Sequence, residues 1–282
     1  MGIAIAVLLA AAASTLFAVS TSLQALEARQ APSSEALRAS LIARLVRRRV
    51  WLLGVVAGAV AWPLQAGALA FASVAIVQPA LGLGLVALLI LGATLLHESI
   101  GGRELGGAVA IGAAVAILGW AAPSGTGHFG VGSTWAIGAA VPAIAALPYA
   151  LRYLRLTGGL PTSVAAGIGW AWVGLATSLV DAALSRHAWF TALGFLAAVA
   201  LVSWSAILAE MTSIQTWPAT RAIPIAFGLE MVLPAALAPV LTSSTPPHSV
   251  GYGGGLALAL VGAGVLGSSR AVASAVAPGP VD

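Results

Sequence analysis

A single glutamate, Glu230, stands at the centre of a long apolar stretch, residues 219–241. A stretch of about 20 apolar residues can cross the hydrocarbon core of a bilayer as a helix. An ionisable residue at that depth costs roughly 2.5–3.5 kcal/mol on insertion scales, so it usually faces a cavity or a partner. Glu230 is therefore expected to couple solute binding to the movement of a proton or cation near the membrane midplane. The alternative is a protonated carboxyl that hydrogen-bonds a neighbouring helix and serves packing.

Other polar and aromatic side chains inside apolar stretches are further candidates for a solute pathway. Gln65 and Gln78 could hydrogen-bond a solute, or satisfy backbone groups freed by nearby prolines. Trp204 lies deep in its stretch, where it could stack on a ligand or simply pack. Asp181 lies near the end of its stretch, where it could pair with Arg186 or mark an external vestibule. Helix breaks that line a cavity are expected at four prolines: Pro63, Pro79, Pro224 and Pro234.

The sequence lacks the residue combinations of common intramembrane enzymes and metal sites. It has no cysteine, and its two aspartates, Asp181 and Asp282, are far apart in the sequence. The His97-Glu98 pair lacks the second histidine of an HExxH zinc motif. The remaining three histidines fall on separate external loops, where imidazoles are usually solvated. We therefore expect no enzymatic activity, no bound metal and no cofactor.

The composition indicates an all-α integral membrane protein. Of the 282 residues, 60% are hydrophobic and 7% are charged, against roughly 25% charged in a typical soluble domain. A soluble fold needs more polar surface than this. All twelve basic residues are arginines, mostly at the ends of apolar stretches. The expected partner is the lipid bilayer, and a nucleic acid is not expected because no soluble domain is present to form a basic binding face.

The apolar residues gather into stretches that are long enough to span a membrane. Against the requirement of about 20 residues for each helix, the sequence predicts nine spans. The break between the second and third rests on the short sequence AFAS. The expected spans are residues 3–25, 50–71, 73–96, 105–121, 134–153, 161–184, 189–209, 219–241 and 252–269.

The arginines predict the orientation of these spans. Residues 27–49 carry six arginines against two glutamates, so this loop should be cytoplasmic. The N-terminus is then outside, the C-terminus is cytoplasmic, and every arginine except Arg186 falls on the cytoplasmic side. Residues 34–49 could also form a short amphipathic helix on the inner membrane surface. Glu210 is expected at the cytoplasmic end of the seventh span, exposed to solvent.

A weak internal repeat suggests two inverted halves. Residues 71–86 can be laid on residues 218–233 at an offset of 147, and residues 104–119 on residues 253–267 at an offset of 148. The paired spans run in opposite directions, as a two-fold axis in the membrane plane requires. The expected division is a first repeat 1–121 with a basic loop 26–49, a linking segment 122–153, a second repeat 154–272 and a tail 273–282.

Two motifs resemble the EamA-type repeats of the drug/metabolite transporter superfamily. In LLHESIGGRELGGA, Glu98 matches the glutamate of the family's GE-R/K turn, with His97 in the place of the glycine and Ser99 in the place of the basic residue. In FGLEMVLPAALAPVL, Glu230 matches the glutamate of an L-E-P pattern, with Met231 in the place of the proline. The nine-span layout with a basic loop resembles the NIPA-type magnesium-transporter branch.

The resemblance implies a multi-pass permease of the inner cell membrane. Such a protein would move a small organic solute or drug by alternating access, coupled to protons if to anything. A NIPA-like Mg²⁺ transporter is the alternative, although one central carboxylate supplies few ligands for that ion. A non-transporting scaffold or assembly partner is the alternative of another class. The substrate, the direction of transport and a homodimeric state stay open at this stage.

Overall fold

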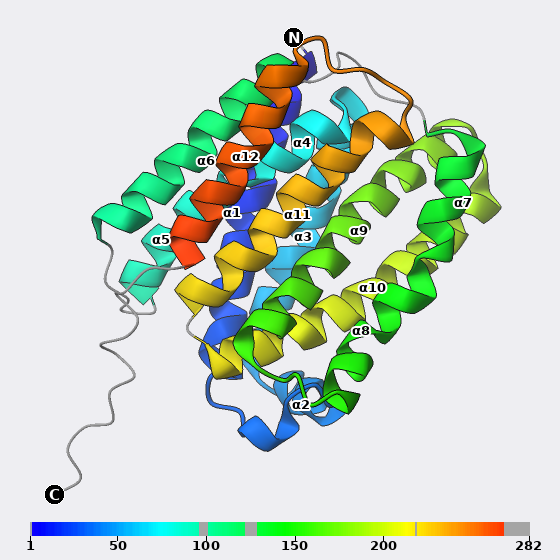
Figure 1. The fold of residues 1–282 in the computed structure, drawn as a ribbon. Helices are drawn as coiled ribbons and strands as arrows, with labels where there is room; N and C mark the ends of the chain where they lie inside the picture. The colour runs from blue at the N-terminus through cyan, green and yellow to red at the C-terminus, as the bar shows by residue number, and fades with distance from the viewer. Residues whose placement is uncertain (1, 96–100, 122–128, 218, 268–282) are drawn as a thin grey trace, which may run out of the picture.

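The computed structural model describes residues 2–95, 101–121, 129–217 and 219–267, and these residues contain helices and no strand. Figure 1 shows a bundle of long helices with a short helical connector at one end. The elements are α1 (Gly2–Ala28), a 3-10 turn η1 (Ser33–Glu35), α2 (Ala39–Leu45), α3 (Arg49–Phe71), α4 (Val74–Leu81), α5 (Gly84–Leu95), α6 (Gly102–Ala121), α7 (Val131–Ala139), α8 (Val141–Tyr153), α9 (Gly159–Ser185), α10 (Trp189–Thr216), α11 (Ala219–Leu241) and α12 (Ser249–Gly267).

Six helices among the described residues are long and apolar enough to cross a membrane. They are α1, α3, α9, α10, most of α11, and α7 with α8 taken together. The apolar stretches in α6 and α12 are shorter, Leu105–Leu118 and Ser249–Val265. The chain thus has the make-up of a multi-pass membrane protein.

The predicted count of nine spans is not confirmed, although the described residues of each predicted stretch are mainly helical. The stretch 73–96 divides into α4 and α5, with Gly82 and Leu83 between them. A Cβ atom at Gly84 would lie 2.7 Å from the carbonyl oxygen of Ser14. The interruption by two glycines thus coincides with a close approach of α5 to α1 that a larger residue would prevent. The predicted break near residues 71–73 is present, between α3 and α4.

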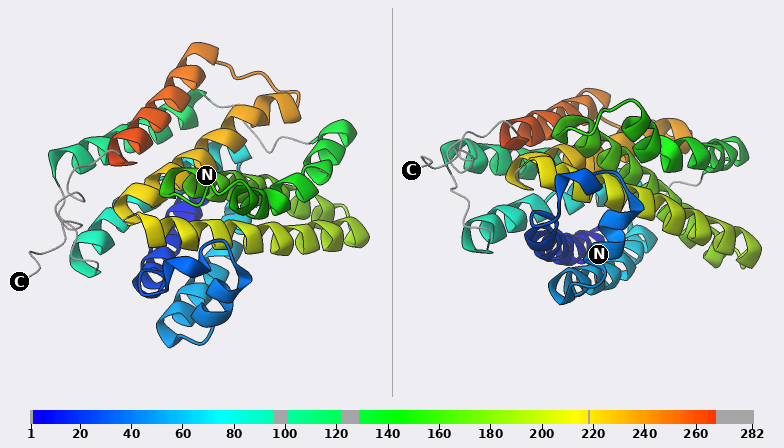
Figure 2. Two further views of the ribbon diagram at one scale, coloured as in Figure 1. Left: turned by 60° about the horizontal axis from the view of Figure 1, so that its bottom comes forward. Right: turned by 90° about the horizontal axis from the view of Figure 1, so that it is seen from below.

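The helices pack in pairs on either side of α11. Helix α1 packs along α3, α9 along α10, and α6 along α12. In both views of Figure 2 the pair α6 and α12 lies on one side of α11, and the pair α1 and α3 lies on the other. Helix α1 also contacts α4 and α5, and α9 contacts α11 in a similar way. The pair α1 and α3 meets the pair α9 and α10 through two contacts, α1 with α10 and α3 with α9.

Small residues let α1 and α3 approach closely. Gly54 and Gly58 of α3 form a GxxxG pattern, which brings helix backbones together in membranes. A Cβ atom at Gly54 would lie 2.8 Å from both the Ser20 carbonyl oxygen and Cγ of Gln24. One at Gly58 would lie 3.0 Å from the hydroxyl of Ser20. A larger side chain at Gly54 would therefore clash with the backbone of α1, whereas one at Gly58 would require the Ser20 side chain to shift.

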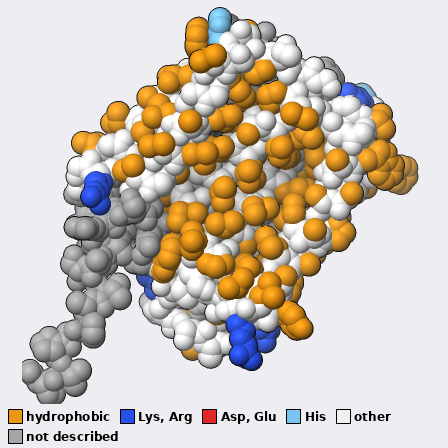
Figure 3. Space-filling model, viewed as in Figure 1, with side chains coloured by type: hydrophobic (Ala, Val, Ile, Leu, Met, Phe, Trp, Pro, Cys, Tyr) orange, Lys and Arg blue, Asp and Glu red, His pale blue; other side chains and the backbone are white. Residues whose placement is uncertain are grey.

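The surface is as apolar as lipid contact requires. In Figure 3, hydrophobic side chains cover most of the visible face, and the basic side chains lie near its edges. Several large apolar side chains are almost fully exposed, for example Phe190 at 93% and Val250 at 89%. Apolar surface of this extent is unusual for a soluble monomer. It fits a protein whose sides face hydrocarbon.

Residues 29–48 form a folded connector between α1 and α3. Leu41, Ile42 and Leu45 of α2 are buried in the protein interior, in a cluster that includes Leu208 and Met211 of α10. The sequence also allowed an amphipathic helix over residues 34–49 that lies on the membrane surface. Helix α2 is shorter than that, and its apolar side chains pack against the end of α10.

Polar contacts hold the connector in place. The Leu37 N–H donates to Oγ1 of Thr212 at 3.0 Å. Within the connector, Arg44 pairs with Glu35 at 2.6 Å, and the Arg44 guanidinium lowers the pKa of the Glu35 carboxyl. This pair therefore contributes stability above the ordinary glutamate pKa of about 4.3 and loses it as the pH falls through the lower folded value.

Candidate functional site

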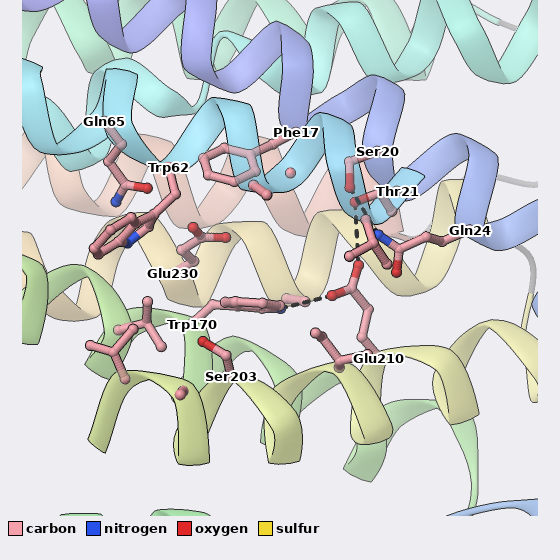
Figure 4. Close-up of a pocket in the computed structure, with 18 of the residues that line it drawn as sticks. Phe17, Ser20, Thr21, Gln24, Trp62, Gln65, Trp170, Ser203, Glu210 and Glu230 are labelled. Carbon is pink, nitrogen blue, oxygen red and sulfur yellow. Dashed lines mark hydrogen bonds between the residues drawn. The ribbon is translucent and has the colours of Figure 1, made fainter. Parts of the chain in front are cut away.

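A cavity of about 410 Å³ lies between α1, α3, α9, α10 and α11. Its walls are mainly apolar, with two carboxyl groups, Glu210 and Glu230, facing the space. Ligand sites are commonly of this kind, an apolar hollow with a few polar groups that fix orientation. Figure 4 shows Glu230 near the rings of Phe17, Trp62 and Trp170, and Glu210 beside Trp170.

Glu230 reaches this cavity from the middle of α11. Its side chain is partly buried, and among the described residues its carboxyl has no hydrogen-bond or ion-pair partner. In Figure 4 it points into the space near Trp62, Phe17 and Trp170. The sequence predicted this residue as the main candidate for solute or proton binding, and the structure places it where such binding could occur.

Glu210 is held in place from two sides. Nε1–H of Trp170 donates to its Oε2 at 2.7 Å, and the hydroxyl of Thr21 donates to its Oε1 at 3.4 Å. The residue is only 7% exposed. Trp170 belongs to α9 and Thr21 to α1, so Glu210 on α10 joins three helices around one carboxyl group.

The expectation that Glu210 is exposed at a helix end was wrong. Helix α10 continues to Thr216, six residues further, which is roughly 9 Å at 1.5 Å per residue. Thr212 and Ser213 lie in this extension of the helix, and their hydroxyls donate to the backbone carbonyls of Leu208 and Glu210. Hydroxyl residues after a charge resemble the end of a span, but they can remain inside a buried helix when they bond its preceding turn.

A polar group lies at the Glu210 end of the cavity. Nε2 of Gln24 donates to the Ser20 hydroxyl at 2.8 Å, one turn apart on α1. Ser20, Thr21 and Gln24 all line the cavity, close to Glu210 in Figure 4. The hydroxyls and the amide could hydrogen-bond a solute at this end.

Aromatic rings form much of the remaining wall. Nε1–H of Trp62 donates to the Thr177 hydroxyl at 3.1 Å, which fixes the ring of Trp62 on α3. Trp170 is fixed by its bond to Glu210. Phe17 and Phe227 complete the set. Because both tryptophans are anchored by hydrogen bonds, their faces are preorganised for contact with a solute.

The other predicted site residues divide between the cavity and its surroundings. Gln65 lines the cavity and is 3% exposed. Trp204 does not line it: the side chain is 40% exposed, and its Nε1–H donates to the Tyr149 hydroxyl at 3.4 Å. Asp181 also lies outside, with one carboxyl oxygen buried and unpartnered, and no ion pair joins it to Arg186. The side chain of Gln78 lies outside the described part of the chain, as do residues His97 and Glu98.

The predicted helix breaks at prolines are not breaks. Helix α3 runs through Pro63, and α11 runs through Pro224 and Pro234. None of these three lines the cavity, and the side chain of Pro79 is outside the described set. Prolines are tolerated in membrane helices where neighbouring groups satisfy the freed backbone.

Two of these prolines free the backbone carbonyls of residues that line the cavity. A proline has no N–H for the carbonyl four residues earlier. Pro63 therefore leaves the carbonyl of Ala59 without its helical donor, and Pro234 does the same for Glu230. Both Ala59 and Glu230 line the cavity. Two residues of the cavity wall thus have carbonyls without their usual helical donor.

Among the described residues, Glu210 and Glu230 are the acidic groups of this cavity, and no basic side chain lines it. Within the described ranges, no three residues of the types His, Cys, Asp and Glu come close enough together to hold a metal ion. No protein-family model matches this chain, and neither a curated protein nor a solved structure matches it.

Proposed function

We propose that the protein is a secondary permease that moves a small organic solute through this cavity by alternating access. The observation that carries the proposal is the unpartnered carboxyl of Glu230, which faces a cavity of about 410 Å³ inside a bundle of apolar helices. An ionisable group at such a place is costly and usually serves a pathway. A packing role would require a hydrogen-bond partner, and none of the described residues provides one.

The arrangement of the helices supports two inverted repeats. We assign α1, α3, α4 with α5, and α6 to the first repeat, and α9, α10, α11 and α12 to the second. Phe71 and Thr216 end equivalent helices, and Val74 and Ala219 begin the next ones; both pairs are 145 residues apart. This offset replaces the 147 expected from sequence matching, which Ala- and Gly-rich segments satisfy in several registers.

The corrected offset brings chemically related positions together. Pro79 falls on Pro224, one turn into the equivalent helices. Gln65 falls on Glu210, and both line the cavity. Substrate sites near the interface of inverted repeats are the common arrangement in secondary transporters. On this basis the division into repeats 1–121 and 154–272, linked by 122–153, is retained as part of the proposal.

The cavity lies where the two halves meet. Helices α1 and α3 line it from one half, and α9, α10 and α11 line it from the other. Rocking of one half against the other would therefore open the space to one side of the membrane and then to the opposite side. Glu230 can carry a proton when the solute is absent and release it when the solute binds, which would couple the two flows.

The lining favours an organic solute over Mg²⁺. Magnesium ions require octahedral oxygen ligands or retained waters, whereas most of this wall is apolar or aromatic. The EamA-type and NIPA-like resemblances, the inner-membrane location and the topology with an external N-terminus remain part of the proposal. A scaffold without transport would not need a cavity that contains two carboxyl groups.

Proteoliposomes that contain a pH-sensitive dye test the proposal. Wild type, Glu230→Gln and Asp181→Asn are challenged with amino acids, small amines, organic anions and Mg²⁺. We expect solute-dependent proton movement in wild type and in Asp181→Asn, whose carboxyl lies outside the cavity, and its loss in Glu230→Gln. Mg²⁺ entry without proton movement would favour the magnesium alternative. Equal solute-driven flux in all three proteins would reduce Glu230 to a packing residue.

A further inference from the structure

We propose that the solute is a small monovalent organic cation whose positive group binds at Glu230 and whose body lies against the aromatic wall. This proposal rests on the cavity being the solute site of the permease. It goes further by naming the chemical class of the solute. It also gives the two glutamates different roles, Glu230 as the exchangeable group and Glu210 as a fixed one.

The charge of the cavity excludes anions as its natural ligand. Glu210 and Glu230 both face the space, and none of the described residues that line it is basic. An organic anion would meet one or two carboxylates without a compensating cation. A neutral solute would leave the carboxyls to be neutralised by protons alone. A cation is the solute class that gains from both groups, because a buried carboxylate without a partner is unfavourable by several kcal/mol.

The two carboxyls differ in their freedom to receive a ligand. Both oxygens of Glu210 already accept hydrogen bonds, from Trp170 and from Thr21. Glu230 has no such partner among the described residues. A single positive charge would therefore bind at Glu230, and Glu210 would add attraction while it keeps Trp170 in place. One exchangeable carboxyl predicts a monovalent cation.

The aromatic wall fits the body and the charge of such a solute. Trp62, Phe17 and Trp170 surround the position of Glu230 in Figure 4. Cations placed over such rings are attracted by the ring quadrupole, most strongly by tryptophan. The ring of Trp62 is anchored by Thr177 and that of Trp170 by Glu210. Little side-chain freedom is lost when a ligand binds between rings that are already fixed.

The cavity size limits the cation to a small one. Its volume of about 410 Å³ is near the lower end of the range of roughly 300–1,000 Å³ that is usual for ligand pockets. An amine or ammonium compound with one aromatic ring matches this space better than a large multi-ring dye.

The test measures binding to the purified full-length protein in detergent by calorimetry and tryptophan fluorescence. The probes are benzyltrimethylammonium, benzyl alcohol and benzoate, which share a ring and differ in charge. We expect the cation to bind most tightly. Glu230→Gln should weaken it at least about tenfold, because the charge partner is lost. Benzyl alcohol should bind the variant and wild type alike.

Two further variants keep the test independent of folding defects. Ala200→Leu fills part of the cavity without touching a carboxyl and should weaken all probes together. Trp62→Phe keeps a ring but removes its anchor to Thr177, and should weaken the cation about two- to fivefold. Each variant is checked for an unchanged elution volume and melting temperature before binding is measured.

The possible outcomes separate the two proposals. Cation binding that is equal in wild type and Glu230→Gln, or tighter binding of benzoate, would overturn the cation assignment. If proteoliposomes then transport benzyl alcohol or benzoate, the permease proposal still stands. If the cation binds through Glu230 but no solute of the panel crosses the membrane, the cation site stands and the permease proposal fails.

Discussion

Replacing Thr212 by valine should release the connector from the end of α10. The Thr212 hydroxyl is fully buried and accepts the Leu37 N–H at 3.0 Å. Leu37 is itself buried and has a φ of 52°, a left-handed conformation that leucine rarely adopts. The hydrogen bond therefore holds a strained residue at the point where the connector touches the helix that carries Glu210.

The size of the effect follows from these contacts. A buried N–H that loses its acceptor costs about 1–3 kcal/mol. The left-handed leucine adds strain of roughly 1–2 kcal/mol, which opening of the connector relieves. The hydrogen-bond loss alone should raise the open population of the connector by about 5- to 150-fold, since 1.4 kcal/mol is a factor of ten.

Trypsin measures this opening because the connector is rich in exposed arginines. Cleavage after Arg38 and Arg44 is followed by mass spectrometry in nanodiscs under conditions in which opening and closing are faster than cleavage, so that the rate tracks the open population. Thr212→Val should be cut faster by the factor above. Thr212→Ser keeps the hydroxyl and should be cut at nearly the wild-type rate. Equal cleavage of wild type and Thr212→Val would show that this hydrogen bond does not hold the connector.

Two further predictions concern helix packing. The Tyr252 hydroxyl donates to the carbonyl of Ala235. Pro239 has no N–H to donate to this carbonyl within the helix. Tyr252→Phe should therefore lower the free energy of unfolding by about 1–3 kcal/mol. In the background Pro239→Ala, which restores the N–H, the same change should cost clearly less, and an unchanged cost in the double-mutant cycle would contradict this account. Gly54→Ala should destabilise the protein by about 1–3 kcal/mol through crowding of α1. Gly112→Ala, where a Cβ atom would meet nothing within 4 Å, is its matched control, and the same fall in melting temperature for both would refute the close-packing argument.

Hydropathy alone predicted where the helices would be. Each membrane helix must pair its backbone N–H and C=O groups internally and present apolar side chains to lipid. It could not predict the interruption between α4 and α5. Gly82 and Gly84 resemble the packing glycines of any membrane helix. The interruption there coincides with the approach of α5 to Ser14, and this approach depends on residues about 70 positions earlier in the chain.

Of the two carboxyl groups of the candidate site, one was predictable from the sequence and the other was not. Glu230 was identifiable because it is the one acidic residue of the apolar stretch 219–241 and lies at its centre. Glu210 was missed because a charge followed by hydroxyl residues looks like the end of a span. Its position becomes clear only from the contacts with Trp170 and Thr21, which come from two other helices. The predicted role of Trp204 depended on depth alone, and depth does not tell which side of a helix faces the interior.

In the proposed division into two repeats, the connector makes the two halves mechanically unequal. Residues 29–48 join α1 to α3 with a folded segment, whereas only residues 186–188 join α9 to α10, the helices that the proposal pairs with α1 and α3. In a permease with exact two-fold symmetry, the cavity would be open to each side of the membrane for equal times. The apparent affinity for the solute would then be the same from both sides. The contacts between the connector and α10 are made at one end of the bundle only. They must therefore favour the conformation in which the cavity is closed at that end. For a permease built in this way, vesicles of opposite orientation should differ in their half-saturating solute concentration, and the connector would be the cause of that rectification.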